Sequence, residues 1–261
     1  MFGNLFDEER LDTAVKEYGV EHKSDSYNYA SQAYGSGSLF VVSVSGKAIV
    51  GEELNERFLR DFSQKISQLH SQGLKFALVV GKGSIARDFV ETAKQFNPSK
   101  AALDEIALQF SKANALMLAQ ALDAAHPKII TEFSEAVSAL DNGRIPIMVQ
   151  SIAGLSTEAT AALAAEYLGG TLVNLADVKG VFAKNPSEKK RQKLLKSVSF
   201  DQLLDLSLEM NLEPEGEAVF DVFSAQILKR GNVKAFVLQA EDLENFENAV
   251  SGREFEGTRI E

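Results

Sequence analysis

The sequence predicts an α/β fold in which a mostly parallel central sheet is flanked by helices on both faces. Short apolar runs of strand length alternate with longer segments of helical periodicity, which is typical of right-handed strand–helix–strand units. Three of the apolar runs lead into turns rich in small residues, at positions 43–47, 79–87 and 150–158. Parallel sheets bind ligands beyond the carboxyl ends of their strands, so these turns mark the predicted site.

Strands are predicted where apolar residues follow one another, and helices where they recur every three to four positions. The expected strands span residues 39–44, 76–80, 129–130, 145–149, 171–175 and 234–238. The expected helices span residues 55–72, 85–95, 101–122, 131–140, 156–167, 200–206, 220–230 and 241–250. Residues 1–38 read as an N-terminal extension, a short amphipathic helix followed by a linker-like arm rich in serine and tyrosine.

The composition limits the classes of function. Of the 261 residues 45% are hydrophobic and 25% charged, and the net charge of −10 argues against a nucleic-acid groove. The chain has no cysteine and only three scattered histidines, so neither a disulfide nor a metal-ligand motif is predicted. No apolar run reaches the length of a membrane span, and the acidic first ten residues are unlike a secretory signal. We therefore expect a cytoplasmic protein that binds small molecules.

The three turns carry the features of a phosphate site. Glycines let backbone N–H groups approach an anion, and helix N-termini favour negative charge. Lys47, Lys82 and Arg87 would add cationic donors. We expect residues 45–47, 81–84 and 151–154 to converge at one edge of the sheet. Taken singly, each turn also fits an ordinary tight turn, and Arg87 also fits a surface ion pair.

Four blocks of sequence, in order, resemble the archaeal-type uridylate (UMP) kinases of the amino acid kinase family. They are residues 81–89, 103–115, 156–159 and 174–186, within a match that runs from Leu39 to the end. The block from Asp104 to Asn114 favours uridylate kinase over the family's amino acid kinases. The resemblance implies a carbamate kinase-like fold, an acceptor-binding lobe over residues 39–175 and a nucleotide-binding lobe over residues 176–261. It also implies phosphoryl transfer from ATP to UMP, Mg²⁺, and a homo-oligomer, commonly a hexamer.

The resemblance implies a role for individual residues by position. Arg87 is an expected catalytic cation by this resemblance, whereas Lys47 and Lys82 are expected catalytic cations from their place in the turns alone; no residue is assigned as a metal ligand. The residues expected to bind the acceptor UMP are Asp104, which would hold the ribose, with Gly83, Ser151, Gly154 and Thr157. The residues expected to bind ATP are Gly46, Gly83, Arg87, Asp177 and Phe182.

The loops depart from the family pattern. Lysines stand at 47 and 82 where the family has small residues, and of the third loop only Gly154 is kept. Either the lysines replace the lost contacts, or the chain is a non-catalytic nucleotide- or oxyanion-binding relative; a kinase of another small acceptor is a third reading. On local grounds Asp104 also fits a helix cap, Glu158 a first-turn acid and Phe182 a core residue.

Overall fold

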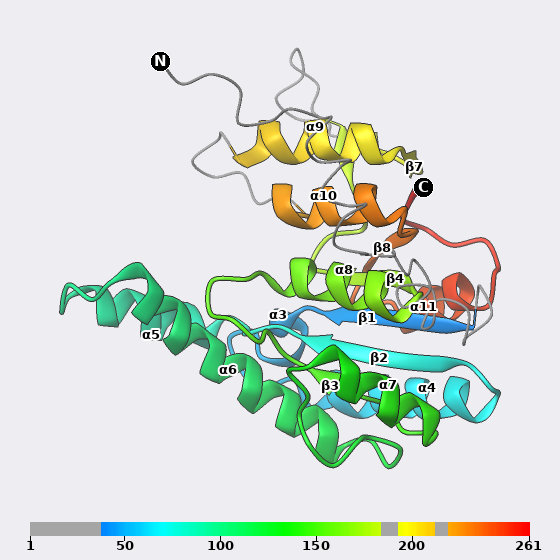
Figure 1. Cartoon of the computed structure of the whole chain (residues 1–261), viewed down its shortest axis with the longest axis horizontal. Coiled ribbons are helices and arrows are strands. Elements are labelled where there is room, and N and C mark those ends of the chain that lie inside the picture. Colours follow the sequence, from blue (N-terminus) through cyan, green and yellow to red (C-terminus); the bar gives the residue numbers. More distant parts are fainter. Residues whose placement is uncertain (1–37, 184–192, 212–218) are drawn as a thin grey trace, which may run out of the picture.

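A seven-stranded sheet forms the centre of the computed structural model, which describes residues 38–183, 193–211 and 219–261 (Figure 1). The strand order is β3-β2-β1-β4-β8-β9-β7, and every pair is parallel except β8 with β9. The strands are β1 (Leu39–Val44), β2 (Lys75–Val80), β3 (Ile147–Met148), β4 (Thr171–Ala176), β7 (Ser197–Val198), β8 (Ala235–Gln239) and β9 (Thr258–Ile260). The predicted fold class is confirmed.

The central strands are apolar on both faces because helices cover both. All six residues of β1 are buried, and their side chains alternate between two core layers, Val41 in one and Phe40 and Val42 in the other. This is the usual pattern of a parallel sheet, whose strands read as continuous hydrophobic runs.

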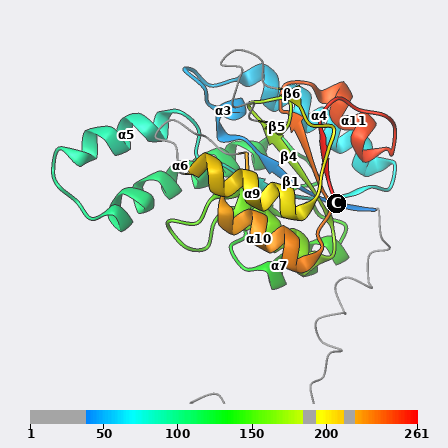
Figure 2. The same cartoon turned by 90° about the horizontal axis from the view of Figure 1, so that it is seen from above.

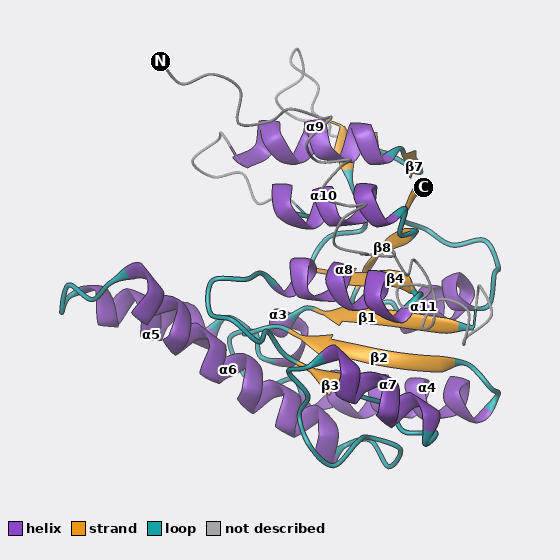
Figure 3. Cartoon of the chain, viewed as in Figure 1, coloured by secondary structure: helices purple, strands orange, loops and turns teal. Residues whose placement is uncertain are grey.

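Two groups of helices form the outer layers (Figure 3). One face carries α7 (Phe133–Asp141), α8 (Thr157–Leu168), α9 (Phe200–Asn211) and α10 (Val222–Gly231). The other carries α3 (Gly46–Ile49), α4 (Glu56–Ser71), α6 (Lys100–Gln120) and α11 (Leu243–Val250). Helix α5 (Ile85–Lys94) and the start of α6 project together from the body, as Figures 1 and 2 both show.

Most predicted elements are present, with ends shifted by a few residues. The strand predicted at 129–130 is wrong, since Ile130 makes only an isolated bridge to Met148. Short elements were missed, among them α3, β7, β9 and the antiparallel pair β5 (Phe182–Ala183) and β6 (Lys193–Leu194). The predicted N-terminal helix and arm lie outside the described residues. The division into lobes at residue 175 stays a prediction, and the sheet itself is continuous across that point.

Candidate active site

The loops that follow β1 and β2 touch each other backbone to backbone. A Cβ atom at Gly46 would lie 2.0 Å from the Gly83 nitrogen, so only glycine fits there. Gly83 has φ +75, a conformation that favours glycine. The buried Asn114 amide donates a 2.9 Å hydrogen bond to the Gly81 carbonyl, which fixes the second loop to α6. The contact leaves two glycine-rich turns side by side at the carboxyl edge of the sheet.

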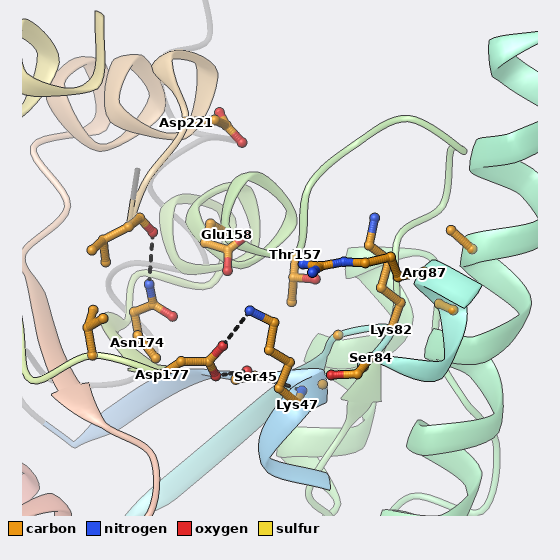
Figure 4. A pocket seen from close by; sticks show the side chains of 18 of the residues that line it. Ser45, Lys47, Lys82, Ser84, Arg87, Thr157, Glu158, Asn174, Asp177 and Asp221 are labelled. Atoms are coloured by element: carbon orange, nitrogen blue, oxygen red, sulfur yellow. Dashed lines mark hydrogen bonds and ion pairs between the residues drawn. The ribbon is translucent and has the colours of Figure 1, made fainter. Parts of the chain in front are cut away.

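A pocket of about 580 Å³ opens above these turns. The loops after β1, β2 and β4 form its floor, and the N-termini of α8 and α10 contribute its walls (Figure 4). Its charged lining mixes cations and carboxylates, namely Lys47, Lys82, Arg87, Glu158, Asp177 and Asp221, and the Asn174 amide lies among them. This pocket therefore offers both donors for phosphate oxygens and carboxylates that can neutralise cations.

Asp177 links the loop after β4 to the loop after β1. Its carboxylate accepts a 2.6 Å hydrogen bond from the Ser45 hydroxyl and lies 2.9 Å from the Lys47 ammonium group. The Lys47 and Asp177 side chains are each about two-fifths exposed, at 41% and 39%. Lys47 thus enters the pocket as one half of an ion pair, whereas the sequence suggested a cation aimed at phosphate.

A second pocket, of about 260 Å³, adjoins the first. Asp104 of α6 and Gly154 of the loop after β3 face each other there, since a Cβ atom at Gly154 would lie 3.2 Å from the Asp104 Oδ2 atom. The residues that line both pockets are Lys82, Ala107, Thr157 and Glu158. The two pockets therefore meet at an ammonium, a hydroxyl and a carboxyl group.

Glu158 is the residue whose ionisation the site changes most clearly. Burial, with smaller contributions from the nearby Asp221 and Asp177, raises the pKa of its carboxyl group from 4.5 to about 7. A backbone hydrogen bond and the Lys82 charge act in the opposite direction. The side chain is partly buried and its carboxyl group faces into the pocket (Figure 4). At neutral pH the carboxyl group is therefore close to half protonated.

The N-termini of two helices are joined at the rim. The Ser156 hydroxyl caps α8 by accepting from the Ala159 amide at 2.9 Å, and it donates to Asp221. Asp221 in turn caps α10 by accepting from the Ser224 amide at 2.7 Å. These bonds hold the first turn of α8, with Thr157 and Glu158, against the edge of the larger pocket.

The structure brings most of the predicted site residues to these two pockets. Gly46, Lys47, Lys82, Gly83, Arg87, Thr157 and Asp177 line the larger pocket, and Asp104 and Gly154 the smaller. Two predicted residues lie outside both linings: Ser151 is exposed, and Phe182 is partly buried in β5. The helix-cap reading of Asp104 is wrong, because α6 begins four residues earlier and its cap is Ser99.

Sequence reasoning missed several polar residues of the site. Asn174 and Asp221 line the larger pocket, and Ser111 and Gln150 the smaller. Ser111 follows Asp104 by two helical turns, a spacing that places both on one face of α6. Gln150 and Asn174 begin two segments that the sequence had already marked, the turn at 150–158 and the block at 174–186, whereas Asp221 comes from a distant part of the chain.

Comparison with known proteins agrees with this architecture. The model of the amino acid kinase family matches residues 38–239. The chain belongs to the amino acid kinase family. Curated relatives within this family include the uridylate kinases of Thermococcus sibiricus, 30% identical over 85% of this chain and 98% of the relative, and Haloarcula marismortui, 30% identical over 84% and 97%. The crystal structure of the Archaeoglobus fulgidus uridylate kinase superposes with a TM-score of 0.74 at 27% identity, covering 85% of this chain and 99% of that one.

Two further findings on this amino acid kinase family member concern metal binding and membrane-spanning helices. Within the described ranges, no group of three or more histidine, cysteine or acidic side chains is arranged to hold a metal ion by itself. No helix in the described part of the chain is both long and apolar enough to cross a membrane.

Proposed function

We propose that the chain transfers the terminal phosphoryl group of ATP to UMP, giving UDP. The observation that carries the proposal is the junction of the two pockets at Lys82, Thr157 and Glu158. Phosphoryl transfer needs a donor and an acceptor held in line with their charges neutralised, and it needs no covalent nucleophile. The relatives named uridylate kinase, which match nearly along their whole length, support this choice of acceptor.

In this proposal ATP occupies the larger pocket. The phosphates lie over the turns at Gly46 and Gly83, where no side chain keeps backbone N–H groups away from an anion. Lys82 and Arg87 neutralise the phosphoryl group during transfer. The Lys47–Asp177 pair faces the same space, so binding of phosphate would draw Lys47 towards the ligand.

UMP occupies the smaller pocket, with its phosphate at the junction. Asp104 accepts hydrogen bonds from the ribose hydroxyls, a role that suits a carboxylate at the mouth of a pocket. Gly154 stands opposite, and its φ of +92 lets the loop pass close to Asp104. Thr157 donates to the phosphate from the first turn of α8, where the helix dipole also favours an anion.

The carboxylates of the larger pocket fit Mg²⁺. This ion is usually held by one or two carboxylates together with substrate phosphates and water, and Asp177 and Glu158 both face the space proposed for the phosphates. Bound there, Mg²⁺ would neutralise phosphate charge. Because the pKa of Glu158 is raised, its carboxyl group would have to lose a proton to hold the ion, and the charge of Mg²⁺ would favour that loss.

A coupled assay of ADP release tests the reaction. Purified chain with ATP and Mg²⁺ is given UMP, CMP, aspartate, glutamate or isopentenyl phosphate in turn. We expect turnover with UMP, and Lys82→Met should lower it about 100- to 1,000-fold by removing a cation from the transferring group. ADP release with a different acceptor only would show that the chain is another kinase of this fold. No ADP release above background with any acceptor would show that it is a non-catalytic binder.

We extend the proposal to a homo-oligomer, a hexamer, that acts in the cytoplasm in pyrimidine nucleotide synthesis. This extension rests on the resemblance to the uridylate kinases. Light scattering after size-exclusion chromatography measures the assembly, and a mass of one 28.4 kDa chain would contradict it.

A further inference from the structure

Thr157 stands where the two pockets meet. It is the first residue of α8 and lines both cavities. Its hydroxyl lies against the turn after β2, since a Cβ atom at Gly81 would come within 3.2 Å of the Thr157 Oγ1 atom. A hydroxyl here can either donate a proton to a ligand or accept one, and only donation favours a phosphate.

Gln150 determines whether the Thr157 hydroxyl donates its proton to a ligand. It follows β3 and is 6% exposed, so its side chain is held within the protein. Its Nε2 atom donates a hydrogen bond to the Thr157 Oγ1 atom at 3.3 Å. An oxygen that accepts this bond keeps its own proton for a different partner, in a direction away from Gln150. The amide therefore sets the Thr157 hydroxyl as a donor.

We propose that Gln150 is a positioning residue for the acceptor phosphate, directing the Thr157 hydroxyl proton to the junction of the two pockets. The inference rests on the proposed function and adds a residue to it. Gln150 touches the smaller pocket only, whereas Thr157 touches both. The loss of Gln150 should accordingly affect the acceptor far more than ATP.

The surroundings of Gln150 agree with a ligand-binding role. Its Oε1 atom is buried and has no hydrogen-bond partner among the described residues, and the same holds for the Ser111 hydroxyl, which also lines the smaller pocket. Buried polar atoms without partners are uncommon in folded proteins. An amide turned the other way would give its oxygen to the Thr157 proton and withdraw that proton from the ligand.

A double-mutant cycle tests whether Gln150 acts on UMP binding through the Thr157 hydroxyl. The variants are Gln150→Met, which keeps the volume without a hydrogen bond, Thr157→Val, and the two combined. Gln150→Glu is isosteric and, once ionised, can only accept, so measured well above neutral pH it tests the reversed amide. Gln109→Met is the matched control, because Gln109 lies on the exposed side of α6 and bonds only to Glu105 among the contacts described. UMP and ATP binding are measured by calorimetry, with KM and kcat beside them.

We expect Gln150→Met to weaken UMP binding about tenfold, with ATP binding unchanged within about twofold. The double variant should bind UMP as Thr157→Val does, because Gln150 acts through that hydroxyl. Gln150→Glu should bind UMP more weakly than Gln150→Met, and Gln109→Met should match the wild type.

Three results would overturn the inference: losses that multiply in the double variant, equal losses for UMP and ATP, or wild-type UMP binding by Gln150→Glu. A wild-type chain that binds UMP without releasing ADP contradicts the proposed reaction alone, and the binding cycle still decides on Gln150. A wild-type chain that binds no UMP overturns both.

Discussion

At the scale of single residues, the environment of Glu158 shows what the fold adds to a side chain. In the sequence it is one of many acids in the first turn of a helix, where the dipole favours its charge. In the structure, burial and two neighbouring aspartates outweigh that effect and raise its pKa to about 7. The sequence could not predict this, because Asp177 and Asp221 come from other elements.

The raised pKa predicts how stability depends on pH. Between pH 4.5 and about 7 the folded chain holds a proton on Glu158 that the unfolded chain has released. The stabilisation from this protonated group is therefore lost as pH rises through that window. Raising the pH from 4.5 to 8 should therefore lower the free energy of unfolding of the wild type by about 2 kcal/mol more than that of Glu158→Gln. This figure allows for solvent screening of a partly exposed group.

Urea unfolding of both proteins at the two pH values measures the gain. Glu135→Gln is the matched control, because Glu135 is an exposed acid in the first turn of α7. The free energy of unfolding of this variant should depend on pH as that of the wild type does. Parallel stability curves for Glu158→Gln and the wild type would show that the carboxyl group stays ionised in the folded chain.

Asp104 carries the second prediction at this scale. Because it faces the smaller pocket and does not cap α6, Asp104→Ala should weaken UMP binding by about 1.5–3 kcal/mol and leave ATP binding nearly intact. Calorimetry with each nucleotide measures both affinities. Equal losses for the two nucleotides, or a lowered melting temperature alone, would point to a structural role.

At the scale of elements, the contact between the turns after β1 and β2 decides which residues the site tolerates. Gly46→Ala would place a Cβ atom 2.0 Å from backbone, where no flexible side chain can give way. We expect it to lower the free energy of unfolding by about 3 kcal/mol and to abolish ATP binding. Gly51→Ala is the control, since the nearest atom would lie 3.5 Å away. Urea denaturation and nucleotide titration would show both effects, and equal stability of the two variants would contradict the steric argument.

The elements that the sequence predicted well are those with the longest apolar runs. β1, β2 and β4 are buried on both faces over most of their length, so most of their residues are hydrophobic and the strands are easy to place. β7 and β9 have two and three residues; β7 is defined by pairing with β9, and β9 by pairing with β7 and β8, which no local pattern encodes. The run at Ile129 and Ile130 is apolar without forming a strand, because β3 accepts only a single bridge there.

At the scale of the whole molecule, Thr258 ties the C-terminal strand to the segment that leaves the larger pocket. Its buried hydroxyl accepts from the Val181 amide at 2.8 Å and donates to the Leu195 carbonyl at 2.6 Å. Val181 lies four residues beyond Asp177, so this hydroxyl anchors the segment that leaves the larger pocket. One side chain thus joins three segments far apart in the sequence.

Thr258→Val should leave the buried N–H of Val181 and the partly buried carbonyl of Leu195 without their partner. We expect a loss of about 2–4 kcal/mol in the free energy of unfolding, measured by urea denaturation. Thr258→Ser keeps the hydroxyl, so its free energy of unfolding should fall clearly less than that of Thr258→Val. If both variants were equally unstable, packing of the methyl group would matter more than the hydrogen bonds.

The placement of the site could be predicted from the sequence, because strand ends in a parallel sheet meet at one edge. The individual contacts could not. The ion pair of Lys47 with Asp177 and the bond from Gln150 to Thr157 depend on how the loops curl after they leave the strands. Ser151 was predicted at the site from its neighbours, yet only the residues beside it line a pocket.

The meeting of the two pockets at Lys82, Thr157 and Glu158 has a consequence for inhibition. Adenosine and uridine joined by a chain of phosphates would reach both cavities as a single molecule. Such a bivalent ligand gives up its translational freedom once, whereas separate nucleotides give it up twice, so its second half binds at a high effective concentration. In the proposed arrangement, the contact between the pockets that allows phosphoryl transfer would also allow one linked dinucleotide to bind in both.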